Sequence, residues 1–260
     1  MPRLERDGFS LYYEVHGAGP AVVFAHGAGG NAMSWWQQVP RFARRYTTIA
    51  FDHRGFARSP CGDAAFHPKH FAGDLLAILD AEGIARAALV CQSMGGWTGV
   101  RTALAAPERV ACLVLAGTPG GIVTPAVIEA TRQIGRSVDR EGIRGNAALA
   151  PGYPQREPAR AFLYDQINAW NGSVDPRWLG RLFDAEGRVD PAALAGWRTP
   201  TLFCTGEVDQ LFPPQAIREV AALLPGAEVA LFPGVGHSTY FEAPEDFDAR
   251  VLAFVGKHHS

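Results

Sequence analysis

The sequence predicts an α/β fold in which a mostly parallel sheet of eight strands carries helices on both faces. Short apolar runs alternate with segments of helical spacing along most of the chain. Most of these runs are continuously apolar, as is typical of strands that are buried on both faces. The chain has 260 residues, of which 47% are hydrophobic, enough to bury one large core.

The strands and helices follow one another in a regular order. Asp7-Gly8 favours a tight turn, so the first two strands should be antiparallel. The expected strands cover residues 3–6, 9–15, 21–25, 47–51, 87–90, 110–116, 201–205 and 228–232. The expected helices cover residues 31–44, 68–81, 97–106, 213–224 and 244–255. In such a sheet, a ligand site is expected at the carboxyl ends of the strands.

The alternation stops between residues 121 and 197. This stretch has no apolar run of the strand type, and its amphipathic segments are interrupted by Pro151, Pro154, Pro158, Pro176 and Pro191. We therefore expect a core domain of residues 1–120 and 198–260, and an insertion of helices, residues 121–197, that lies over the sheet.

The charge balance excludes several classes of partner. The net charge of −2 gives no basic patch for nucleic acid or an anionic membrane. No apolar run approaches the roughly 18 residues needed to span a bilayer, and the first residues are charged. We expect a cytoplasmic protein that binds neither nucleic acid nor membrane.

The sequence also gives no sign of a metal or a cofactor. The glycine-rich stretch from His26 to Asn31 lacks the Lys-Ser/Thr pair of a phosphate-binding loop and the G-x-G-x-x-G pattern. The four cysteines are far apart and three lie in apolar runs, so we expect small buried side chains rather than a disulfide framework or a zinc site. These cysteines are Cys61, Cys91, Cys112 and Cys204.

Ser93 is the candidate nucleophile. It follows a buried strand after one intervening polar residue, and Gly95 and Gly96 lead from it into a helix. A serine at such a turn presents its hydroxyl at the edge of the sheet, beside the free N–H groups of the helix N-terminus. A serine in this position can instead serve only as a helix cap.

Two later strands also end in residues suited to catalysis. Asp209 follows the strand 201–205, and His237 follows the strand 228–232. A serine hydroxyl needs a base to accept its proton, and the histidine needs a carboxylate to orient it. Glu207 is the rival acid, Cys91 is a rival nucleophile, and Asp209 alone could be a helix cap.

With these residues in this order, the chain resembles the α/β-hydrolase superfamily, in its small, capped form, over essentially its full length. The resemblance implies a triad of Ser93, Asp209 and His237, and a helical cap formed by the insertion after the sixth strand. The matching features are His26-Gly27, Asp52-x-Arg54-Gly55 with Ser59, the turn at Ser93, Gly206-x-x-Asp209, and Gly236-His237 followed by Glu242, Pro244 and Phe247.

The resemblance further implies an oxyanion hole formed by the backbone N–H groups of Ala28 and Met94. Each donor of this kind contributes on the order of 3 kcal/mol to catalysis. The chain departs from the family pattern in one place, because Cys91 stands where the family has glycine, two residues before the nucleophile. A small cysteine should still allow the helix to approach the strand closely.

Other polar residues of the motifs are expected to have structural roles. We expect His26 to orient its loop by hydrogen bonds, and Asp52 and Arg54 to form an ion pair that ties loops together.

Several aromatic residues are candidates for a substrate pocket. In the helical insertion these are Phe162, Tyr164, Trp170 and Trp178. Trp97 and Trp35-Trp36 can line the same pocket or pack in the core.

The first hypothesis for function is a serine hydrolase that cleaves a carboxylic ester, a lactone or a related small acyl compound through an acyl-enzyme. Its partner would be an apolar or aromatic small molecule. The same triad also supports hydrolysis of carbon-carbon bonds in ring-cleavage diketones, and perhydrolase chemistry. A third hypothesis is a ligand-binding or biosynthetic member of the fold with slow turnover.

Overall fold

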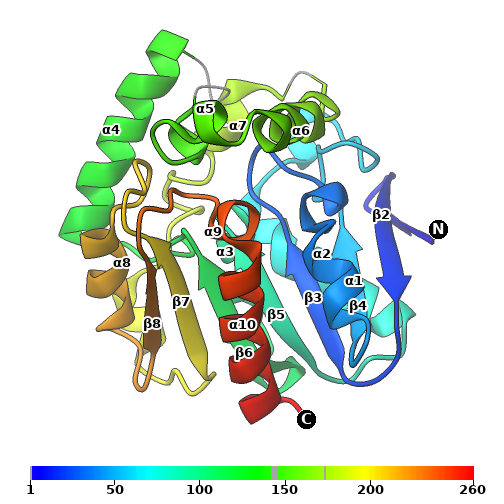
Figure 1. Ribbon diagram of the computed structural model, residues 1–260. Coiled ribbons are helices and arrows are strands. Elements are labelled where there is room, and N and C mark those ends of the chain that lie inside the picture. The colour runs from blue at the N-terminus through cyan, green and yellow to red at the C-terminus, as the bar shows by residue number, and fades with distance from the viewer. Residues whose placement is uncertain (1, 142–145, 173) are drawn as a thin grey trace.

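A single eight-stranded sheet organises the protein (Figure 1). The computed structural model describes residues 2–141, 146–172 and 174–260. The strand order is β1-β2-β4-β3-β5-β6-β7-β8. The strands are β1 (Arg3–Arg6), β2 (Phe9–His16), β3 (Ala21–Ala25), β4 (Thr47–Phe51), β5 (Ala87–Gln92), β6 (Val110–Ala116), β7 (Thr201–Gly206) and β8 (Glu228–Phe232). Only β1-β2 and β2-β4 pair antiparallel, so the predicted mostly parallel sheet is confirmed.

The hairpin at the N-terminus forms where Asp7-Gly8 predicts it. Arg6 pairs with Phe9 across a two-residue turn in which Asp7 and Gly8 have φ values of +49° and +80°. Positive φ at both central residues gives the turn a twist that matches the strands.

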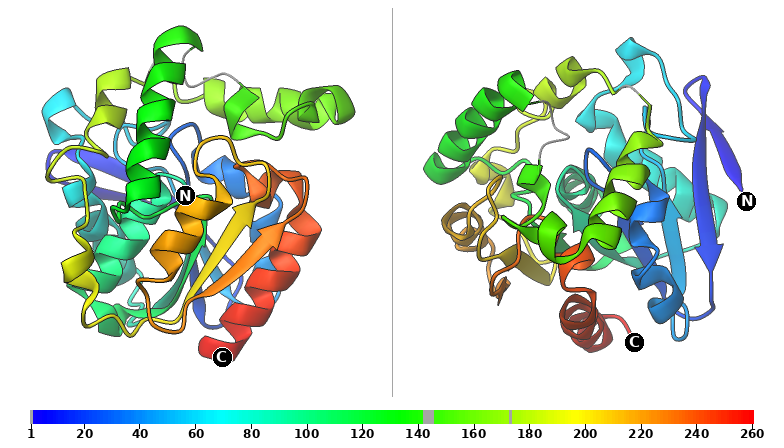
Figure 2. Two further views of the ribbon diagram at one scale, coloured as in Figure 1. Left: turned by 90° about the vertical axis from the view of Figure 1, so that its left-hand side faces the viewer. Right: turned by 45° about the horizontal axis from the view of Figure 1, so that its top comes forward.

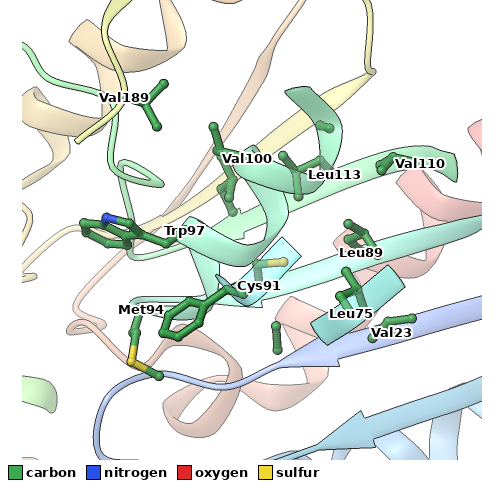
Figure 3. Close-up of a cluster of buried hydrophobic side chains, with 14 of the residues drawn as sticks. Val23, Leu75, Leu89, Cys91, Met94, Trp97, Val100, Val110, Leu113 and Val189 are labelled. Atoms are coloured by element: carbon green, nitrogen blue, oxygen red, sulfur yellow. The ribbon is translucent and has the colours of Figure 1, made fainter. Parts of the chain in front are cut away.

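Helices cover the sheet on both faces. On one face lie α2 (Phe71–Ala81), α3 (Gly95–Ala105) and α8 (Pro214–Ala221), and on the other lie α1 (Gln38–Phe42) and α10 (Pro244–His258). The side chains of β5 alternate between the two resulting cores. Leu89 and Cys91 join the first core (Figure 3), and Ala88 and Val90 the second. Burial on both faces explains why the strand sequences are continuously apolar.

The expected helix over residues 31–44 is instead two short helices. A 3₁₀ helix, Ala32–Trp35, is capped by the side chain of Asn31 and is followed by α1. Pro40 lies inside α1, and a proline ring clashes with the carbonyl four residues earlier, here that of Trp36. One continuous helix is therefore disfavoured.

The segment between β6 and β7 is helical, as its prolines and amphipathic spacing predict. Its α-helices are α4 (Pro125–Glu141), α5 (Tyr153–Arg156), α6 (Pro158–Ala169) and α7 (Pro176–Gly180). In the described part of this segment, the only β-pairing is an isolated bridge between Ile122 and Val189. The helices gather beyond the carboxyl ends of the parallel strands (Figures 1 and 2).

The remaining helices are short. They are α9 (Thr239–Glu242) and 3₁₀ helices at Asp63–Ala65, Pro68–His70, Pro107–Arg109, Asn146–Ala148 and Pro191–Leu194. Within the described ranges, none of the helices combines the length and the apolar character needed to cross a bilayer.

Candidate active site

Ser93 lies in a tight turn between β5 and α3. Its φ of +48° is in the left-handed region, which residues other than glycine rarely adopt and which occurs often at functional sites. A Cβ atom at Gly95 would lie 2.2 Å from the carbonyl oxygen of Ala25, and one at Gly96 would lie 2.4 Å from the Thr118 hydroxyl. The two glycines therefore allow α3 to begin directly against the ends of β3 and β6.

Asp209 and His237 lie side by side at the ends of β7 and β8. The Nδ1 atom of His237 is 2.9 Å from Oδ2 of Asp209, and both side chains are buried. The other carboxylate oxygen of Asp209 accepts hydrogen bonds from the backbone N–H groups of Leu211 and Phe212, at 2.8 and 3.0 Å. Both oxygens are thus engaged, and the carboxylate is fixed in an orientation that leaves Nε2 of His237 available.

Ser93 and His237 line the same cavity, which has a volume of about 450 Å³. The end of β6 brings their loops together. The N–H of Ser93 donates to the carbonyl of Ala116 at 3.0 Å, and a Cβ atom at the next residue, Gly117, would lie 3.0 Å from Nδ1 of His237. Among the described residues, no hydrogen bond within 3.5 Å joins the Ser93 hydroxyl to the His237 ring. Such bonds are often longer without substrate and shorten when it binds.

Two backbone N–H groups on the wall of this cavity have no acceptor. Ala28 and Met94 both line the cavity, and in the described part of the chain neither N–H donates a hydrogen bond. Nearly all backbone N–H groups in folded proteins are paired, and two unpaired N–H groups that line one cavity are typical of a site that receives an anionic oxygen.

His26 fixes the loop that carries Ala28. Its Nδ1 lies 2.7 Å from the carbonyl oxygen of Gly27, and its Nε2 accepts the N–H of His53 at 2.9 Å. Burial lowers the pKa of His26 to about 4, so the ring is neutral at pH 7, with its proton on Nδ1. The expected orienting role is consistent with these two bonds.

Gly99 leaves space for the Cys91 side chain. A Cβ atom at Gly99, one helical turn into α3, would lie 2.7 Å from the sulfur of Cys91. The missing side chain at Gly99 therefore makes room for the cysteine that replaces the family's glycine. Burial raises the pKa of the Cys91 thiol, which keeps it protonated and argues against a nucleophilic role.

The expected ion pair between Asp52 and Arg54 does not form. Arg54 instead pairs with Asp74, its Nε lying 2.6 Å from Oδ2, and Asp52 accepts from Nε of Arg58 at 2.8 Å. Asp52 also accepts the N–H of Ala32 at 2.7 Å. The guanidinium groups and their carboxylates thus belong to two separate structural networks, and neither pair lines the cavity.

The two other carboxylates of the motifs bind backbone. Glu207, the rival acid, accepts the N–H of Gly234 at 2.9 Å and is exposed. Glu242 accepts the N–H of Ala150 at 2.9 Å, and burial raises the pKa of this carboxyl group. Glu242 thus joins the region of His237 to the helical segment.

The helical segment forms the outer wall of the cavity. Of its four candidate aromatic residues, only Tyr164 lines the cavity, and its hydroxyl lies 3.1 Å from that of Ser238. Phe162 and Trp170 are 65% and 54% exposed, and Trp178 stacks on Phe66. The apolar residues of α6 are spread around the helix, so its sequence gives little indication of which side faces inward.

Of the three tryptophans expected either to line the pocket or to pack in the core, only Trp97 lines the cavity. Trp35 packs on Phe24 in the core, with ring centroids 5.1 Å apart. Sequence reasoning missed Gln92 and Asn168, which also line the cavity. Gln92 directly precedes Ser93, and this position was a signal that could have identified it.

The α/β fold, the turn at the end of β5 and the paired acid and histidine together define a class of hydrolytic enzymes. The family model described as alpha/beta hydrolase family matches residues 22–250. The chain therefore belongs to the alpha/beta hydrolase family.

Similar proteins support an enzyme that hydrolyses small molecules. "Putative carbamate hydrolase RutD" of Azorhizobium caulinodans is 29% identical, over 99% of both chains. Among solved structures, a hydrolase from Pseudomonas aeruginosa PA01 is 28% identical, over 98% of each chain, with a TM-score of 0.82. Est816, described as an N-acyl homoserine lactone degrading enzyme, is 25% identical with a TM-score of 0.82, over 98% of this chain and all of that one.

Proposed function

We propose that this protein is a serine hydrolase that cleaves a carboxylic ester, a lactone or a related small acyl compound. The observation that carries the proposal is the shared cavity, whose wall holds the Ser93 hydroxyl, the His237 ring oriented by Asp209, and two N–H groups that have no acceptor among the described residues.

In the acylation step, His237 acts as the general base. Its Nε2 accepts the proton of the Ser93 hydroxyl while the oxygen forms a bond to the substrate carbonyl carbon. The carbonyl oxygen becomes an oxyanion, which the N–H groups of Ala28 and Met94 stabilise. The intermediate then expels the alkoxide leaving group, which takes the proton from His237, and an ester of Ser93 remains.

In the deacylation step, water replaces the alcohol. His237 accepts a proton from the water molecule, whose oxygen attacks the acyl carbon at the same oxyanion site. Collapse of this second intermediate returns the proton to the Ser93 oxygen and releases a carboxylic acid. Asp209 remains ionised throughout and stabilises the imidazolium that forms twice in each cycle.

The proposed substrate is apolar, because many of the residues that line the cavity are large and apolar. They are Met94, Trp97, Ile134, Leu179, Leu182, Phe183, Leu211 and Phe212. We assign residues 121–197 as the helical cap that supplies much of this wall, over a core domain of residues 1–120 and 198–260. The two parts would then divide the tasks of substrate selection and chemistry.

Covalent labelling tests the nucleophile. A fluorophosphonate probe should label the wild-type protein on one peptide that contains Ser93, and the Ser93→Ala variant should remain unlabelled. The Cys91→Ala variant is the matched control for the rival nucleophile and should label normally. A folded wild-type protein that fails to react, or reaction at another residue, would contradict the proposal.

A substrate panel tests the class of reaction. Esters, lactones, thioesters and vinylogous diketones should be compared, and hydrolysis of the acyl compounds should fall by at least 10³-fold in Ser93→Ala. Consumption of diketones alone would favour carbon-carbon hydrolysis, and tight ligand binding with negligible turnover would favour a receptor.

A further inference from the structure

A second cavity lies behind the first, against α4. Its volume is about 350 Å³, and it shares three lining residues, Trp97, Leu182 and Phe183, with the cavity that holds Ser93. Neither the triad proposal nor the motifs of the sequence give this second cavity a role. We call it the α4 chamber. Its other lining residues are Gly121, Val123, Val127, Ile128, Thr131, Arg132 and Arg188.

The wall between the two cavities has one fixed part and one movable part. The indole N–H of Trp97 donates to the carbonyl oxygens of Leu182 and Gly187, at 3.0 and 2.9 Å, and these bonds hold the ring in place. Phe183 packs edge-on against Trp97, with ring centroids 5.5 Å apart and an interplanar angle of 89°. The Phe183 side chain is half-buried and has no polar atom, so only packing holds it. The ring of Phe183 is therefore a part of the shared wall that no polar contact restrains.

The lining of the α4 chamber is suited to an alkyl chain. Its inner surface comes from Val123, Val127 and the wall residues of the first cavity. The two charged lining residues, Arg132 and Arg188, are both exposed, which places their guanidinium groups on the solvent side, and Arg132 lies 3.6 Å from Glu129 in an ion pair. No acidic residue is part of the described lining.

We propose that the α4 chamber is a second binding compartment, which takes the distal end of a long apolar acyl chain that enters past Phe183. This inference rests on the proposed function, because the carbonyl end of the same chain would lie at Ser93. The carbonyl would be held at the ends of β3 and β5, while the chain extends along the apolar wall and beneath α4. Substrates with short chains would occupy the first cavity alone.

Filling the chamber is the direct test. Thr131 is half-buried on α4 and lines the chamber, so Thr131→Phe should occupy part of its volume. Gln133→Phe adds the same ring at an exposed position of the same helix that lines neither cavity, and is the matched control. Each buried methylene strengthens binding about fourfold. We expect Thr131→Phe to lower the kcat/KM ratio of p-nitrophenyl decanoate to butyrate at least tenfold, with butyrate hydrolysis unchanged.

Opening the wall should have the opposite effect. Phe183→Ala should raise the decanoate-to-butyrate ratio, and Thr131→Phe in the same chain should cancel that increase. Phe162→Ala removes a phenyl ring from an exposed site on α6 and should leave the ratio unchanged. If Thr131→Phe changes the ratio no more than Gln133→Phe does, the proposal is overturned.

A binding measurement separates this inference from the proposed function. If the wild-type protein hydrolyses no ester, lactone or thioester of any chain length, the proposed function fails, and equilibrium dialysis of labelled 1-decanol then tests the chamber alone. Binding that Thr131→Phe weakens at least tenfold, and Gln133→Phe does not, would support the chamber. Equal binding by the three proteins would overturn it.

Discussion

The edge of the sheet and the helical segment beyond it differ in how tightly their residues are packed. At the sheet edge, Cβ atoms at Gly95 and Gly96 would lie 2.2 and 2.4 Å from their nearest neighbours. In the helical segment the packing varies, because a Cβ atom at Gly187 would lie 2.2 Å from the carbonyl oxygen of Arg181, whereas Cβ atoms at Gly172 and Gly180 would meet no atom within 4 Å. The positions beside the candidate triad therefore leave almost no room for added volume, whereas the space around these two positions of the helical segment is open.

This difference suggests how one scaffold can serve many substrates. The proposed chemistry depends on close approaches between strand ends, which are fixed by backbone packing and have recognisable sequence patterns. The proposed selectivity depends on side chains of short helices, which can change without disturbing the sheet. The predictions below test this contrast, beginning with the largest effect.

The largest effect is expected at the sheet edge, from Asp209→Asn. An amide can still accept the N–H bonds of Leu211 and Phe212, but it cannot stabilise the imidazolium of His237. By analogy with other triads, kcat should fall about 10⁴-fold while the melting temperature changes little. Glu207→Gln, which alters an exposed carboxylate in the same loop, should change kcat less than threefold. Comparable losses in the two variants would contradict the assignment of Asp209.

The second prediction concerns pH and the buried ring of His26. Its pKa is lowered to about 4 in the folded protein, against 6.5 for the unfolded chain. The unfolded state therefore binds this proton first as the pH falls. The corresponding stability is fully present above pH 6.5 and is lost as the pH falls through about 4, a change of roughly 3 kcal/mol.

Urea unfolding at pH 7.5 and pH 4.5 would measure this effect. His26→Asn should lower the stability at pH 7.5, but should show a smaller loss on acidification than the wild type. The comparison with a variant is needed because Asp248 has the opposite effect on stability. Burial raises the pKa of Asp248 to about 6, so its contribution to the unfolding free energy is lost as the pH rises. His16→Asn, at an exposed ring, should retain the wild-type dependence. An equally steep loss in His26→Asn would refute the assignment.

The third prediction compares an added methyl group in the two regions. In Gly99→Ala, the new Cβ would lie 2.5 Å from Leu113 and 2.7 Å from the sulfur of Cys91, so overpacking should outweigh the better helix propensity. We expect a loss of about 1 to 2 kcal/mol in unfolding free energy. Gly180→Ala, the control in α7, should be neutral or stabilising. The Cys91→Gly/Gly99→Ala double variant should lose less than the two single variants together, whereas simple additivity would argue against the compensation.

The contrast between the regions also explains what the sequence could predict. Ser93, Asp209 and His237 could be selected because each follows a strand of the predicted sheet, and parallel strands end at one edge. Gly99 and its contact with Cys91 could not be anticipated, because the fit depends on the distance between a helix and a strand. The central strands are predicted by their continuous apolar runs, and the first two strands by the Asp7-Gly8 turn between them.

The predictions that were wrong concern contacts that depend on the tertiary structure. Arg54 and Asp52 are neighbours in sequence, yet each pairs with a residue from another part of the fold, because buried charges select the partner with the best geometry. Similarly, Tyr164 and Phe162 are two residues apart on α6 and so point in nearly opposite directions, but only the structure shows that Tyr164 faces the cavity and Phe162 faces solvent. The rotation of α6 depends on contacts with the sheet edge that its own spacing does not reveal.

The smallest effect is expected where the two regions meet. The Asn171 side chain donates to the carbonyl of Gly29 at 2.8 Å, and Asn31 donates to the carbonyl of Ile167 at 2.9 Å, so the end of α6 is fastened to the loop that carries the N–H of Ala28. Asn171→Ala removes one of these bonds, worth about 1 kcal/mol. We expect kcat to fall about fivefold with KM nearly unchanged, because the loop would be less well held when the oxyanion forms.

Asn171→Asp keeps the shape but repels the Gly29 carbonyl, so its kcat should be at least as low. Full activity in Asn171→Asp would show that the Asn171 side chain acts only by filling space. The hydrogen bond from Asn171 would then contribute nothing to the position of the loop that carries Ala28.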